Sequence, residues 1–183
     1  MTPRATVRTI LVARGLRAFA DGFVSVLLPA YLLALGMGRI DVGLISTATL
    51  IGSAIATLAV GRWGYRVPIR RMLLIAAAVM VASGLLFAGL DAFWPLVVVA
   101  FLGTLNPSAG DATVFLPLDH TLLAAGPASG RTVVFARYSF VGSIAAAAGA
   151  LAAGVPEWLG ARAGWTTLAG LQAMFVLYAA IGA

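Results

Sequence analysis

Six long apolar stretches alternate with short polar links along this 183-residue chain. They cover residues 18–38, 42–60, 72–90, 92–118, 132–156 and 163–183. Each is close to the roughly 20 apolar residues that a helix needs to cross about 30 Å of hydrocarbon. Because the links are short, successive helices must run antiparallel. The pattern predicts an all-α membrane protein in which residues 1–183 form a single domain of six transmembrane helices.

The composition favours lipid as part of the solvent. Apolar residues make up 62% of the chain and charged residues only 10%, whereas soluble domains usually carry about 25% charged residues. The net charge is +6, but the arginines lie between the apolar stretches rather than in one patch. We therefore expect a lipid bilayer, not nucleic acid, as the partner. Cysteine is absent, and the sequence contains no zinc-ligand spacing, nucleotide loop or nucleophile triad. We expect no enzymatic activity, no cofactor and no metal.

The arginines also predict how the chain is oriented. Ten of the twelve lie in the N-terminal segment, the second-to-third link and the fourth-to-fifth region. The other two, Arg39 and Arg162, lie on the opposite side. Arginine is enriched in cytoplasmic loops, so we expect a multi-pass protein with both termini in the cytoplasm. Small residues every four positions, among them Gly52 in the second stretch and Gly142 in the fifth, predict closely packed helix faces.

The link between the second and third stretches carries a recognisable pattern. Residues 61–71 read GRWGYRVPIRR. This run resembles the loop signature of the major facilitator superfamily, glycine-x-leucine-alanine-aspartate-arginine-x-glycine-arginine-arginine. The matching positions are Gly61, Arg66, Arg70 and Arg71. Tyr65 stands where the signature has its aspartate, and Pro68 where it has its second glycine, so the salt bridge usual in that loop is not expected here.

The resemblance implies a scaffold and a function. It implies the N-terminal six-helix half of such a transporter, built from two inverted three-helix units, in a bacterial cytoplasmic (inner) membrane. The implied function is secondary active transport of a small molecule by alternating access, with protons as a candidate coupling ion. No arginine follows the last apolar stretch. We therefore expect the partner to be a second six-helix half or another copy of the chain.

Charged residues inside the apolar stretches are the candidate pathway residues, because a charge within a membrane span is costly and usually faces a partner or water. Asp21, Asp111 and Arg137 are such residues. Asp111 and Arg137 lie at similar depth on successive predicted helices and are expected to pair. Arg17 stands four residues before Asp21, on the same helix face.

Two predicted helices also contain a helix breaker. Pro29 lies in the first, and Asn106 and Pro107, followed by Gly110, lie in the fourth. Breakers at corresponding positions of inverted repeats indicate a transport site. Two interpretations stay open for the buried charges: salt bridges that hold the bundle, or a polar cluster along a pathway. The alternative functions are a truncated or non-transporting structural or regulatory membrane module and, third, a six-helix channel.

Overall fold

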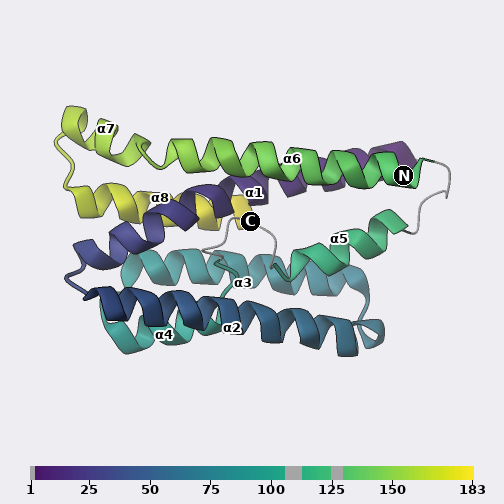
Figure 1. Cartoon of the computed structure of the whole chain (residues 1–183), viewed down its shortest axis with the longest axis horizontal. Coiled ribbons are helices and arrows are strands. Elements are labelled where there is room, and N and C mark those ends of the chain that lie inside the picture. Colours follow the sequence, from purple (N-terminus) through teal and green to yellow (C-terminus); the bar gives the residue numbers. More distant parts are fainter. Residues whose placement is uncertain (1–2, 106–112, 125–129) are drawn as a thin grey trace.

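The computed structural model describes residues 3–105, 113–124 and 130–183, and Figure 1 shows its helices lying roughly along one common direction. In order they are α1 (Pro3–Ala34), α2 (Arg39–Trp63), the short 3-10 helix η1 (Gly64–Arg66), α3 (Ile69–Gly89), α4 (Phe93–Leu102), α5 (Phe115–Ala124), α6 (Arg131–Ala152), α7 (Val155–Ala163) and α8 (Thr167–Gly182). The described residues contain no strand. The prediction of an all-α protein is confirmed.

The first helix is longer than the apolar pattern predicts. It begins at Pro3 rather than near residue 18, because arginine is a good helix former and Arg14 and Arg17 interrupt only the hydropathy of the run. It ends at Ala34, before Gly36, whose φ of 84° belongs to the left-handed region. The amide of Gly36 donates to the carbonyl of Leu33 at 3.0 Å, which closes the last turn.

The helices pack in pairs around α1. It lies against α6 along much of its length and also contacts α8, while α2 packs on α4 and α3 on α8 (Figure 1). Two glycines make the contact between α1 and α6 possible. A Cβ atom at Gly22 would stand 2.1 Å from the carbonyl oxygen of Ala146, and one at Gly149 would stand 2.0 Å from that of Phe19. Of the small-residue face predicted on α6, Ala146 packs against α1 in this way, and Gly149 beside it does the same.

The main core forms where α1, α3 and α8 meet. The ring of Tyr31 lies 4.9 Å from that of Phe175, and Phe87 stacks on Phe175 at 5.5 Å between centroids. The Tyr31 hydroxyl donates to the carbonyl of Phe87 at 2.6 Å. This bond satisfies a buried polar group that would otherwise weaken an apolar core. The three elements form one packed unit.

The later predicted helices differ from the structure. The continuous helix predicted over 92–118 is wrong, because α4 ends at Leu102 and α5 begins only at Phe115. A Cβ at Gly103 would stand 2.9 Å from the Cβ of Ser83 on α3, so the chain leaves α4 where it approaches α3 closely. The helix predicted over 132–156 divides at Ala153 into α6 and α7. The last helix begins at Thr167, not at residue 163.

Within the described residues, four stretches are long and apolar enough to cross a membrane. These are Val7–Ala34, Arg39–Arg66, Ile69–Gly89 and Arg131–Trp158. Two shorter apolar helices, Phe93–Leu102 and Thr167–Gly182, correspond to parts of the predicted fourth and sixth spans. The arrangement in six spans and two inverted units stays a prediction.

Candidate functional site

Three charged side chains share one face of α1. Arg14, Arg17 and Asp21 follow one another at spacings of three and four, which places them on neighbouring turns. Arg14 and Asp21 are only 6% and 4% exposed. Asp21 lies about 21 Å along the helix from Val7, at roughly 1.5 Å per residue. It therefore stands near the middle of the candidate span Val7–Ala34.

The side chain of Arg17 connects α1 to α5 directly and to α6 through a shared carboxylate. Its Nη2 atom forms an ion pair with Oδ2 of Asp119 on α5 at 2.5 Å. The hydroxyl of Tyr138 on α6 donates to the same carboxylate oxygen at 2.9 Å. The Arg17 guanidinium also lies over the ring of Phe115, 4.2 Å from its centroid. One buried carboxylate thus joins α1, α5 and α6.

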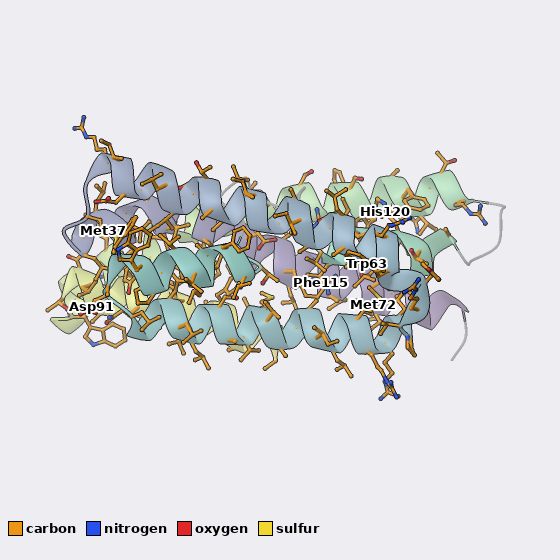
Figure 2. The ribbon with its side chains drawn as sticks, turned by 90° about the horizontal axis from the view of Figure 1, so that it is seen from below. Met37, Trp63, Met72, Asp91, Phe115 and His120 are labelled. Carbon is orange, nitrogen blue, oxygen red and sulfur yellow. The ribbon has the colours of Figure 1, made fainter. Side chains whose placement is uncertain are left out.

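Arg14 occupies a space that a glycine leaves free. Its guanidinium lies over the Tyr138 ring at 5.0 Å. A Cβ at Gly142 would stand 2.6 Å from its Nε atom. His120 meets the Tyr138 ring edge-on at 5.4 Å between centroids. In Figure 2 the labelled Phe115 lies toward the middle of the bundle, and His120 lies nearer the end that carries Trp63.

A second polar group lies near the end of α4. It contains the hydroxyl of Tyr178 on α8, a side chain that is only 1% exposed. That hydroxyl lies 3.1 Å from Oγ1 of Thr104, and both groups are buried. Thr104 comes two residues after the last residue of α4. A buried pair of hydroxyl groups thus lies at the point where α4 stops.

The cluster combines two guanidinium groups and two carboxylates at low exposure. Each such charge is costly within a membrane span and is retained where it has a partner or a function. A carboxylate in this position can take up a proton or a cation, and a guanidinium can bind an anionic group. Either event would change the pairing between α1, α5 and α6.

The predicted site residues have different outcomes. Arg17 and Asp21 lie on one face of α1 as expected, but the hydrogen bond of Arg17 goes to Asp119. Arg137 is exposed on α6. Asp111, Asn106 and Pro107 lie outside the described residues, so the pair between Asp111 and Arg137 stays a prediction.

Pro29 lies inside α1, which continues past it to Ala34.

The four residues of the loop signature lie together where α2 turns into α3. Gly61 belongs to the end of α2, Arg66 to η1, and Arg70 and Arg71 to the first turn of α3. All four are exposed. Tyr65 is the residue that replaces the signature's aspartate. Its hydroxyl accepts a hydrogen bond from the Nε atom of Arg66 at 2.8 Å.

Sequence reasoning missed Arg14 and Asp119 as members of the cluster. A pattern could have revealed Asp119: it stands four residues after Phe115 and four before Leu123, both of which are buried on α5. Recognising it required that residues 115–124 be treated as a separate helix. Arg14 was assigned to the segment ahead of the first span, where arginines mark orientation.

Comparisons with known proteins give one informative result. No family model matches the chain, and no solved structure matches it. The chain is 32% identical over 171 residues to the uncharacterized membrane protein YJR124C of Saccharomyces cerevisiae. The alignment covers 90% of this chain and 37% of that protein, so the chain spans little more than a third of its relative's length. Together with the four helices of sufficient length, this result supports a multi-pass membrane protein.

Proposed function

We propose that the chain is one six-helix half of a secondary transporter, which moves a small molecule by alternating access. The observation that carries the proposal is the position of Asp21, which is buried near the middle of the candidate span Val7–Ala34, with Arg17 and Arg14 one and two turns before it on the same helix. Membrane proteins retain such charges mainly along substrate, ion or proton pathways. The resemblance of residues 61–71 to the major facilitator signature points to the same class of protein.

A second observation supports this function over a plain scaffold. The buried hydroxyls of Thr104 and Tyr178 meet where α4 stops, and transporters bind their cargo beside interrupted helices near the bilayer midplane. A channel has less support, since Arg17 and Asp119 pair across packed helices rather than face an open pore. The competing function is a non-transporting membrane module in which the same ion pairs only hold the helices together.

The partner follows from the proposed function. In a transporter of this class, one half rocks against the other around a shared site. The partner is therefore a second six-helix half or a second copy of the chain, and the setting is a cellular membrane, with the bacterial inner membrane as the expected one. The substrate is a small molecule, with protons as the proposed coupling ion.

The test is flux through liposomes that contain the purified chain. Monomeric and cross-linked dimeric preparations are reconstituted separately, and proton flux is recorded while a panel of small solutes is added under an imposed pH gradient. We expect saturable, solute-dependent flux from the dimer and none from the monomer. Absence of such flux from both preparations, in vesicles that contain folded protein, would favour the structural module. Saturable flux from a strict monomer would contradict the assignment as a half.

A further inference from the structure

An apolar cavity lies beside the turn between α2 and α3. Its volume is about 370 Å³. The described residues around it come mainly from the last turns of α2 and the first turns of α3, and from the end of α4: Ala56, Ala59, Trp63, Met72, Val79 and Leu102. Because α4 stops at Leu102, it covers the groove between α2 and α3 along only part of their length. The rest of the groove runs toward the turn.

The open end of this groove carries a concentrated positive charge. Arg62, Arg66, Arg70 and Arg71 lie within ten positions of one another, and all four are exposed. No acidic residue occurs in the sequence between Asp41 and Asp91. Among the described residues none of the four arginines forms an ion pair, and the one contact of Arg66 is with Tyr65. The charge of the turn is therefore not neutralised by the described parts of the chain.

The labelled residues show that the cavity and the charged turn are at one end of the molecule. Trp63 and Met72, which both line the cavity, lie together at the end of the bundle opposite Met37 and Asp91 (Figure 2). Met72 directly follows Arg71 in the sequence, and Trp63 directly follows Arg62. An apolar groove thus begins within one or two residues of several exposed guanidinium groups.

We propose that this groove binds an anionic phospholipid, with an acyl chain between α2 and α3 and the headgroup phosphate on the arginines of the turn. Guanidinium groups suit phosphate because they donate several hydrogen bonds in a fixed plane. Clusters of four or more basic residues at a membrane-facing helix end are typical of anionic-lipid recognition. The apolar cavity wall can hold an acyl chain, which a phospholipid has and a free phosphate ion lacks. This site does not depend on whether the chain is a transporter.

Trp63 provides a direct probe, because it lines the cavity. Trp94, Trp158 and Trp165, all exposed, are replaced by phenylalanine so that Trp63 is the sole tryptophan. The chain is reconstituted with phosphatidylglycerol or phosphatidylcholine brominated at mid-chain, each diluted in unlabelled phosphatidylcholine. Bromine quenches tryptophan fluorescence on contact. We expect the apparent affinity for phosphatidylglycerol to exceed that for phosphatidylcholine by at least about fivefold.

Two pairs of variants separate the headgroup from the acyl chain. Arg70→Gln with Arg71→Gln should abolish the preference, while Arg39→Gln with Arg162→Gln, which removes the same charge from exposed positions elsewhere, should keep it. Ala59→Phe should fill the groove and reduce quenching, while Ala54→Phe, on the same helix outside the cavity lining, should not.

Two results would overturn the lipid site. One is equal quenching by the two lipids, or a preference that survives Arg70→Gln with Arg71→Gln. The other is a Trp63 that no brominated lipid quenches while cross-linking captures a dimer through α2, because a second copy would then cover the groove.

Discussion

Arg17 and Asp119 are separated by 102 positions in the sequence and form a 2.5 Å ion pair between α1 and α5. The same carboxylate oxygen accepts the hydroxyl of Tyr138 from α6. A single buried carboxylate therefore connects an early helix of the chain to two later ones. A change in the charge of Asp119 therefore alters contacts of all three helices, whichever function the cluster serves.

Replacing Asp119 by asparagine should destabilise the folded chain. Arg17 would keep its charge in a largely buried position without a carboxylate, and breaking a buried pair in this way costs about 3–5 kcal/mol. Arg17→Gln combined with Asp119→Asn should recover much of that loss, because neither charge then remains. Thermal unfolding in detergent, followed by circular dichroism, measures the effect.

The control for this cycle is Asp91→Asn. Asp91 is exposed in the link between α3 and α4, and surface substitutions usually change stability by no more than about 0.5 kcal/mol. If the losses of the two single variants simply add in the double variant, the ion pair does not hold the helices together.

Two glycines should respond in opposite ways to the same substitution. Gly149→Ala places a Cβ 2.0 Å from the carbonyl oxygen of Phe19, so α1 and α6 must separate, at a cost of about 1–3 kcal/mol. Gly43→Ala on the exposed side of α2 meets nothing within 4 Å, and its better helix propensity should stabilise by up to about 1 kcal/mol. Unfolding midpoints of the two variants check the prediction. Equal effects would mean that α1 and α6 are not closely packed.

The lack of cysteine allows orientation to be tested with single substitutions. Figure 2 places Met37 and Asp91 at one end of the bundle and Trp63 at the other. Tyr65→Cys, close to Trp63, should react with a membrane-impermeant maleimide only in inverted vesicles, since arginine-rich turns face the cytoplasm. Asp91→Cys should react only in intact cells. Labelling of both from the same side would exclude a membrane-crossing α3.

The hydropathy pattern predicted the helical class and the positions of α2 and α3 well. It succeeded there because those helices coincide with uninterrupted apolar runs bounded by Gly38 and Pro68. It failed on α1, where arginines that have partners inside the protein lower the hydropathy without ending the helix. It failed again after Leu102, where the break depends on the close approach of Gly103 to its neighbours, a tertiary contact that periodicity does not register.

The candidate site was predicted only in part, for a related reason. Charges on one helix can be paired by spacing, so Arg17 and Asp21 were recognised together. Pairs between helices depend on how those helices rotate and cross, and Asp119 became a partner of Arg17 only when α5 was seen as a separate helix. The role of Gly142 also depends on another helix: because it has no side chain, the Arg14 guanidinium can lie against it.

If the buried charges of α1 serve transport, replacing one of them should stop flux without unfolding the protein. The most direct measurement is solute-dependent flux in liposomes for the dimeric wild type, Asp21→Asn and Asp91→Asn, with the folded fraction of each recorded by its thermal transition. Asp21→Asn is predicted to remain folded while its flux falls to background, and Asp91→Asn to transport like the wild type. Wild-type flux from folded Asp21→Asn, or a loss of flux that only follows a loss of folded protein, would contradict the claim.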